Sequence, residues 1–247
     1  MPRYRLLLEY DGAPFQGWQR QGTGPSVQAA LEAALRACAG EEATVVAAGR
    51  TDAGVHALGQ VAHVDLGRRW APERLVGALN FHVRPALVAV LEACEVPDEF
   101  HARFSARRRR YVYRILNRRP PPALERHRVW HVPVPLLAPL MHEAAQCLVG
   151  RHDFTSFRSS ECQSASAVKT LSLVHVRQAG TLIEVRLQAR SFLHHQVRNI
   201  VGTLKLVGEG KAGIEHVARV LAARDRAAAG QTAPAQGLFL EGVDYDG

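Results

Sequence analysis

A nine-residue segment, Gly49 to Ala57, combines a carboxylate, a guanidinium and an imidazole on a turn predicted between two strands. Asp52 could attack a substrate or accept a proton, with Arg50 and His56 nearby, and the flanking glycines permit close approach of a ligand. The simpler interpretation is a turn in which Asp52 accepts hydrogen bonds from local backbone N–H groups. The Gly-x-x-x-x-Gly spacing is not followed by Lys and Ser or Thr, which excludes a phosphate-binding P-loop.

The stretch from Phe100 to Tyr111 interleaves arginines with aromatic residues. Arginines neutralise phosphates and aromatic rings stack on bases, so this composition suits RNA binding. The alternative is a solvated basic face without a ligand. Under the RNA interpretation, the candidate phosphate-binding residues are Arg103, Arg107, Arg108, Arg109 and Arg110.

A second candidate anion site lies at His194 and His195, near the predicted start of a helix, because helix N-terminal N–H groups attract anions. The histidines of the chain lack the compact spacing of a metal site, such as His-Glu-x-x-His, so we expect no metal. A Gly-x-Ser-x-Gly motif is also absent, which removes the commonest hydrolase signature.

The charge balance favours a polyanionic partner. There are 31 Lys and Arg against 23 Asp and Glu, which gives a formal charge of +8. The four cysteines form no Cys-x-x-Cys pair, so neither a disulfide framework nor a zinc knuckle is predicted. The sequence contains no stretch of about 18 uncharged apolar residues and no apolar signal core, so we expect a cytoplasmic protein outside the membrane.

Hydrophobic periodicity predicts the elements that must position these residues. Residues 4–10 alternate apolar and polar side chains, which predicts a strand, and Ser26 and Gly40 are placed to cap a helix. Further strands are expected at 43–48, 60–66, 107–116, 183–188 and 238–245, and further helices at 72–79, 140–148, 197–207 and 214–221.

These elements mix strands of antiparallel type with helices and lack the regular alternation of a parallel sheet, which predicts an α+β fold. Pro120 to Pro122 cannot lie inside a central strand or a helix. We therefore expect the chain to cross there between an N-terminal α+β domain, residues 1–119, and a C-terminal one, residues 120–247.

Six blocks, in order along almost the whole chain, resemble the tRNA pseudouridine synthase A family. GRTDAGVHA is the most specific of them. The blocks are Tyr10–Gly12 with Phe15–Gln19, Gly49–Ala57 with Gly59–Val61, Phe100–Ala106 with Tyr111 and Tyr113, His152–Arg158, Phe192–Gly202, and Thr232–Ala235 with Gly237–Leu238.

The resemblance implies an isomerase that converts uridine to pseudouridine at positions 38, 39 and 40 in the anticodon stem-loop of tRNA. The reaction breaks the bond from ribose to N1, turns the base and joins ribose to C5. It is redox-neutral and needs no cofactor.

The resemblance also assigns roles to particular residues. Asp52 matches the essential aspartate, Tyr111 the active-site tyrosine, Arg198 the basic partner of the aspartate, and Arg50 the arginine that helps displace the target base. Elementary chemistry agrees, because a guanidinium keeps a neighbouring carboxylate ionised and a paired uridine must be flipped out before it can react.

The family fold implies two ferredoxin- or RRM-like halves whose antiparallel sheets join around a central basic cleft. It also implies a homodimer that binds the anticodon stem-loop and the elbow of tRNA.

Three other interpretations remain open from the sequence. A non-catalytic RNA-binding protein would use the same basic and aromatic segments without needing Asp52. A hydrolase built on Asp52 and His56 would release a base or cleave RNA. A related synthase would modify different uridines.

Overall fold

The computed structural model describes residues 1–22 and 24–246, and its contacts divide the chain into two units. Unit 1 is Met1–Arg107 together with the C-terminal stretch from Phe239, and unit 2 is Arg108–Leu238. The sequence predicts a division at 119/120 instead. The difference has a topological reason: the strand that begins at Arg108 pairs inside unit 2, and the last strand returns to pair inside unit 1.

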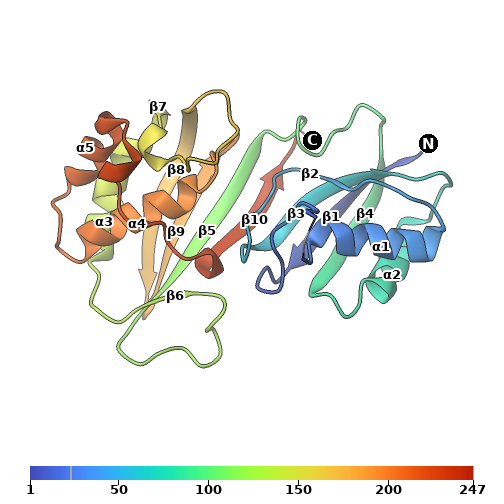
Figure 1. The fold of residues 1–247 in the computed structure, drawn as a ribbon, viewed down its shortest axis with the longest axis horizontal. Coiled ribbons are helices and arrows are strands. Elements are labelled where there is room, and N and C mark those ends of the chain that lie inside the picture. Colours follow the sequence, from blue (N-terminus) through green and yellow to red (C-terminus); the bar gives the residue numbers. More distant parts are fainter. Residues whose placement is uncertain (23, 247) are drawn as a thin grey trace. The chain divides into compact units, whose positions relative to one another are not determined.

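Unit 1 is built on a sheet whose central strands are β1 and β3. Strand β1 pairs antiparallel with both β3 and β4, β2 pairs antiparallel with β3, and β10 pairs parallel with β3. Helices α1 and α2 pack against each other, and α2 contacts β4 (Figure 1). The elements are β1 (Arg3–Tyr10), α1 (Val27–Ala39), β2 (Val46–Ala47), β3 (His56–Asp65), α2 (Pro72–His82), β4 (Val88–Val96) and β10 (Leu238–Asp244).

Local sequence explains the first two elements. Tyr4, Leu6 and Leu8 alternate into the core with no exposed surface, as a strand with one buried face requires. The Ser26 hydroxyl accepts a hydrogen bond from the Ala29 N–H at 3.2 Å and caps α1, which ends at Gly40 in the left-handed region. Both predictions are confirmed.

The strands of unit 2 pair antiparallel in the order β5, β9, β8, β7, and β6 pairs parallel with β5. Helix α3 packs on β8, and α4 contacts α3 and β5 (Figure 1). The elements are β5 (Arg108–Asn117), β6 (Trp130–Val132), α3 (Ala138–Ala145), β7 (Gly150–Asp153), β8 (Val168–Ala179), β9 (Leu182–Ala189), α4 (Gln196–Gly208) and α5 (His216–Ala223), with short 3-10 helices at Gln146–Leu148, Thr155–Phe157, Arg226–Ala228 and Ala235–Gly237.

The predicted strand around 183–188 and the helix around 197–207 are confirmed by β9 and α4. Strands β4 and β8 were not predicted. The pairing of each with its neighbour contains a register shift. In the pairing of β4 with β1 the shift lies between Leu7 and Leu8 of β1, and in the pairing of β8 with β9 it lies between Leu171 and Leu173 of β8. A β-bulge moves the following side chains to the other face, so the period of two is lost.

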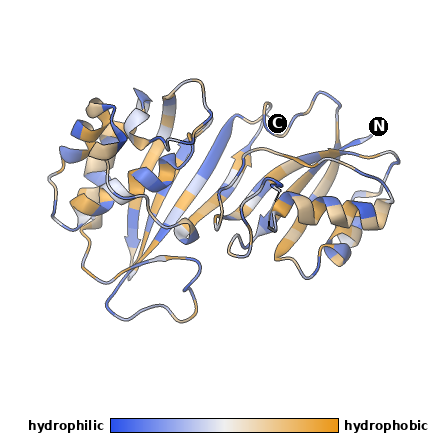
Figure 2. Ribbon diagram, in the orientation of Figure 1, coloured by the Kyte–Doolittle hydropathy of each residue, from blue (hydrophilic) through white to orange (hydrophobic). Residues whose placement is uncertain are grey.

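The fold is a mixture of helices and mostly antiparallel strands, which agrees with the α+β prediction. Hydrophobic residues run along the strands of both units, while β5 is hydrophilic where it begins at Arg108 (Figure 2). Within the described residues, no helix combines the length and the apolar character needed to cross a membrane.

Candidate active site

Asp52 lies in the loop between β2 and β3, and Thr51, the residue before it, is buried and held by hydrogen bonds. The Tyr10 hydroxyl lies 2.8 Å from Thr51 Oγ1, and the Trp18 N–H donates to the Thr51 carbonyl oxygen at 3.0 Å. Gln60 Nε2 donates to the Tyr10 hydroxyl at 3.3 Å. Burial raises the pKa of Tyr10 to about 12 although the bonds to Thr51 and Gln60 oppose it, so this hydroxyl stays neutral near pH 7.

Two glycines let the segment that follows β1 pack directly against this loop. A Cβ added to Gly12 would overlap the Val55 carbonyl oxygen. Gly17 has a φ of +104° and its missing Cβ would lie 2.7 Å from the Thr51 carbonyl oxygen. The Tyr10–Trp18 block therefore packs against the backbone of the Asp52 loop and supports it. Sequence reasoning did not assign this supporting role, although both blocks belong to the resemblance.

His56 has a place in the core of unit 1. It is 1% exposed, its Nδ1 accepts a hydrogen bond from the Gly12 N–H at 3.0 Å, and its ring stacks on Phe239 with centroids 4.6 Å apart. An imidazole packed in this way orients the backbone around it. The geometry therefore does not favour His56 as the base of a hydrolase.

Tyr111 and Arg198 both belong to unit 2. Tyr111 is half-buried on β5 and meets the Phe192 ring edge-on, with centroids 5.1 Å apart. Arg198, in the first turn of α4, donates from Nε to the Ala233 carbonyl oxygen at 2.7 Å, and the Ala233 N–H donates back to the Arg198 carbonyl oxygen at 3.2 Å. The helix is thereby joined to the Thr232–Ala235 block, and the Arg198 side chain has a defined direction.

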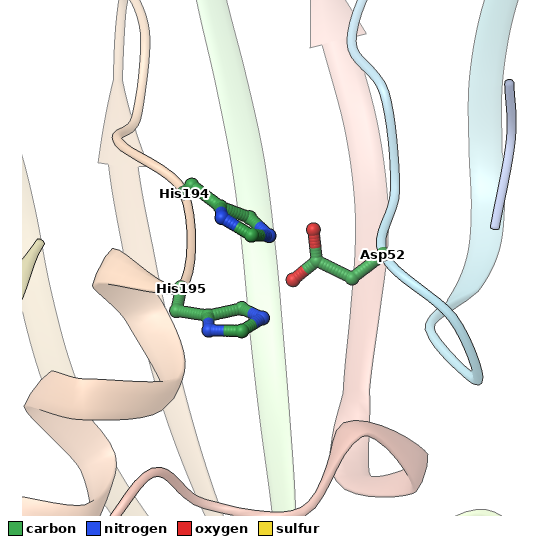
Figure 3. A group of neighbouring side chains, drawn as sticks. All are labelled: Asp52, His194 and His195. Atoms are coloured by element: carbon green, nitrogen blue, oxygen red, sulfur yellow. The ribbon is translucent and has the colours of Figure 1, made fainter. Parts of the chain in front are cut away.

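His194 and His195 lie on the turn that leads into α4, and their rings project side by side from it (Figure 3). The ring centroids are 4.0 Å apart. His195 has a φ of 61°, an uncommon value for a residue other than glycine, and its carbonyl oxygen accepts the Asn199 N–H at 2.9 Å. Figure 3 also shows the Asp52 side chain extending from its own loop in unit 1.

The arginine run does not form one uniform surface. Arg107 belongs to unit 1 and is ion-paired with Asp246, with Nε 2.7 Å from Oδ2. Arg108 is exposed and donates to Gln188 Oε1 at 3.3 Å, whereas Arg109 is only 7% exposed and donates to the Arg190 carbonyl oxygen at 2.5 Å. Side chains alternate along a strand, so consecutive arginines face different environments.

Arg103 and the neighbouring Phe104 are exposed on the loop before β5. The Arg103 guanidinium lies 5.6 Å from the Phe104 ring centroid, and His101 covers the same ring at 4.4 Å. His101 Nδ1 also accepts the N–H groups of both residues, at 3.1 and 3.3 Å, so the backbone of the loop is held in place. This loop presents an aromatic ring and a cation to the solvent together.

Comparison with known proteins agrees with the resemblance. The family model described as tRNA pseudouridine synthase matches residues 7–105 and 144–246. A protein named tRNA pseudouridine synthase A from Rhodospirillum centenum is 60% identical over 245 residues, which cover 99% of this chain and 100% of that protein. A protein of the same name from Paramagnetospirillum magneticum is 59% identical, and the match covers 99% of this chain and 96% of that protein. Another from Methylobacterium radiotolerans is 56% identical, and the match covers 100% of this chain and 99% of that protein. The chain therefore belongs to the tRNA pseudouridine synthase family, whose members are isomerases that act on tRNA.

Proposed function

We propose that this protein converts uridine to pseudouridine at positions 38, 39 and 40 in the anticodon stem-loop of tRNA. The observation that carries the proposal is the Asp52 carboxylate, presented by a loop whose neighbouring backbone and hydroxyl groups are fixed, in a chain of this family. A rigid loop holds a reacting group in one geometry, which is what an isomerase acting on a flipped base requires.

The proposed reaction needs no electron donor or acceptor. The bond from ribose C1′ to N1 breaks, the uracil turns, and C1′ bonds to C5, while C5 loses a proton and N1 gains one. Asp52 either attacks a carbon or accepts the proton, and Arg198 is its basic partner in this proposal. Tyr111 stacks on the uracil, and Arg50, which is exposed, takes the space that the base leaves. Because the atoms and electrons balance within the substrate, the proposal includes no cofactor.

The exposed and half-buried cations supply the proposed contacts to tRNA. Arg103 and Arg108 are exposed, and Arg110, His194 and His195 are half-buried; all of them lie on loops or at the start of an element. Arg107 is paired with Asp246 and Arg109 is buried, so we assign them weaker contributions to phosphate binding. The same proposal includes five further features that rest on the family resemblance. These are the ferredoxin-like halves, the basic cleft, the homodimer, the contact with the tRNA elbow and the cytoplasmic location.

The test is a modification assay with purified protein and unmodified tRNA, without added metal or nucleotide. Pseudouridine is mapped by chemical labelling for the wild type, for Asp52→Asn and for Asp98→Asn, which changes an exposed aspartate elsewhere in unit 1. We expect product at positions 38–40 with the wild type and Asp98→Asn, and none with Asp52→Asn. The affinity of Asp52→Asn for tRNA should stay within a few-fold of wild type.

Other outcomes favour the rival functions. If no variant makes product but all bind tRNA tightly, the protein is an RNA-binding module. If Asp52→Asn loses tRNA affinity in parallel with product, the catalytic assignment of Asp52 fails. Product at other uridines identifies a synthase with a different target.

A further inference from the structure

A cavity of about 520 Å³ opens on the surface of unit 2, and no residue proposed above for catalysis lines it. Its walls come from three separate stretches of the chain: residues 155–160, the start of α4, and residues 224–232. The charged side chains in the walls are three arginines, Arg158, Arg224 and Arg226, and one aspartate, Asp225. The cavity therefore has an excess of positive charge.

Arg226 is held in the wall by neutral groups. Its Nη1 donates to the Gly230 carbonyl oxygen at 3.0 Å, and its Nη2 donates to Thr232 Oγ1 at 2.9 Å and to Asn199 Oδ1 at 3.1 Å. Asn199 is 1% exposed and donates in turn to the Phe157 carbonyl oxygen at 2.9 Å. Within the described part of the chain, Arg226 forms no ion pair, so its charge is fixed in position and not neutralised by a carboxylate.

Arg158, in the wall formed by residues 155–160, is also held by neutral groups. Its Nη2 donates to the carbonyl oxygens of Cys162 and Ser164 at 2.6 and 2.8 Å. Among residues 1–22 and 24–246, Arg158 has no acidic partner, so its positive charge is not neutralised by a carboxylate. The pKa of the Cys162 thiol is lowered although burial opposes this; the backbone N–H groups of Ser164 and His194 and the charge of Arg158 are the causes.

The acidic groups near the cavity compensate little of this charge. Asp225 is exposed, and its Oδ1 accepts the Ala227 N–H at 2.9 Å. The exposed Arg224 lies 3.5 Å from Asp153 Oδ2, and a pair at the surface with this spacing is weak. The start of α4 contributes His195 and Asn199 to the wall, and the positive end of the helix adds to the attraction for an anion.

We propose that this cavity binds a phosphate group of the tRNA backbone. Guanidinium groups held in fixed directions suit the tetrahedral oxygens of phosphate, and the start of α4 lies in the same walls. The inference rests on the proposed function for its ligand, because tRNA supplies a high local concentration of phosphates. It goes beyond that function by assigning an anchoring site to Arg158, Arg224 and Arg226.

The first experiment measures tRNA affinity against salt concentration for Arg158→Gln and Arg224→Gln. Arg118→Gln is the matched control, because Arg118 is an exposed arginine of the same unit, held by the Pro120 and Pro121 carbonyl oxygens at 3.1 and 3.4 Å, and it does not line the cavity. We expect each cavity variant to bind about tenfold more weakly and to make the negative slope of log K against log salt shallower by about 0.7–0.9. The control should change neither quantity.

The second experiment locates the phosphate by ethylation interference, in which single tRNA phosphates are neutralised one at a time. With wild type, ethylation at the contacted position weakens binding. With Arg158→Gln the same ethylation should have no further effect, because the contact is already lost. Arg224→Gln serves as the second variant, since its side chain is exposed and its removal does not disturb the Cys162–Ser164 turn.

Three results would overturn the inference. The first is that every ethylation weakens the cavity variants as much as the wild type. The second is that Arg118→Gln changes the salt slope as much as the cavity variants do. The third is that inorganic phosphate or UMP binds the wild type tightly, in an Arg158-dependent manner, while tRNA affinity is unchanged by Arg158→Gln; the ligand would then be a small anion. Because these readouts measure binding, a wild type that binds tRNA but makes no pseudouridine would contradict the proposed function and leave the cavity inference standing.

Discussion

The Tyr10 hydroxyl lies 2.8 Å from Thr51 Oγ1, in the core of unit 1 and one residue from the proposed catalytic aspartate. Gln60 Nε2 donates to the same hydroxyl and also to the Gly49 carbonyl oxygen at 2.7 Å. A tyrosine on the first strand is thereby linked to Thr51 and, through Gln60, to Gly49, both of which precede Asp52 in the loop. We expect Tyr10 to be a positioning residue that acts on Asp52 through Thr51.

Tyr10→Phe should therefore lower kcat by about 10- to 100-fold, because small misplacements of a reacting group have effects of this size. The affinity for tRNA should be unchanged, and the free energy of unfolding should fall by about 1 kcal/mol for the lost buried hydrogen bond. Single-turnover kinetics and chemical unfolding measure the two effects. Tyr4→Phe is the control, because Tyr4 is equally buried on β1 but bonds to the Trp70 backbone, at 2.7 and 3.0 Å. An equal loss of kcat in both variants would refute the positioning role.

Phe104 should stack on a base of the bound tRNA. Its ring is 70% exposed and is backed by His101 and Arg103. Because base stacking contributes about 1–3 kcal/mol per base, Phe104→Ala should weaken tRNA binding by about 5- to 100-fold, and Phe104→Trp should retain most of the affinity. The salt slope should stay constant, since no phosphate contact is lost.

Phe81 provides the control for this stacking. It is 71% exposed and also lies beside a histidine, His82, but at the end of α2 and edge-on at 5.0 Å. Phe81→Ala should leave tRNA affinity unchanged when both variants are measured by filter binding. Equal losses for the two phenylalanines would mean that surface hydrophobicity, and not a stacking site, is responsible.

Folding stability should decrease in acid because of His63. Desolvation, then the nearby His101 and Arg3, lower the pKa of His63 to about 4, against a partial opposing effect of Asp65. The unfolded chain therefore binds more protons than the folded protein between pH 6.5 and 4, and the free energy of unfolding should fall by about 2–4 kcal/mol as the pH drops through this range. Urea unfolding at several pH values should show a flatter profile for His63→Gln. His82→Gln, an exposed control, should follow the wild type.

Cys162 should be the thiol that alkylates at the lowest pH. Burial raises its pKa, but the N–H groups of Ser164 and His194 and the Arg158 guanidinium outweigh this and lower it, whereas burial raises the pKa of Cys38 and Cys147. The thiolate is the reactive form, so iodoacetamide labelling of Cys162, followed by mass spectrometry, should begin at a lower pH. Arg158→Gln should move this onset upward and Arg118→Gln should not. Unaltered labelling of Cys162 in Arg158→Gln would show that its charge has little local effect.

The sequence predicted well those elements whose periodicity is unbroken and whose ends carry capping residues. Strand β1, helix α1, strand β9 and helix α4 are of this kind, because an amphipathic face and a cap are local properties. Strands β4 and β8 escaped prediction because register shifts interrupt their alternation. The predicted strand at 43–48 shrinks to the two residues of β2.

The sequence by itself determined that Asp52 lies on a turn between strands, and its ordered blocks pointed to the family, because both are written in neighbouring residues. Only the tertiary structure decided which arginines are available. Strand alternation buries Arg109 while its neighbour Arg108 is exposed, and folding brings Arg158 and Arg226 into one cavity although they lie 68 positions apart in the sequence. Such contacts depend on how distant segments pack and on which side of a strand each residue falls, and no local pattern in the sequence encodes them.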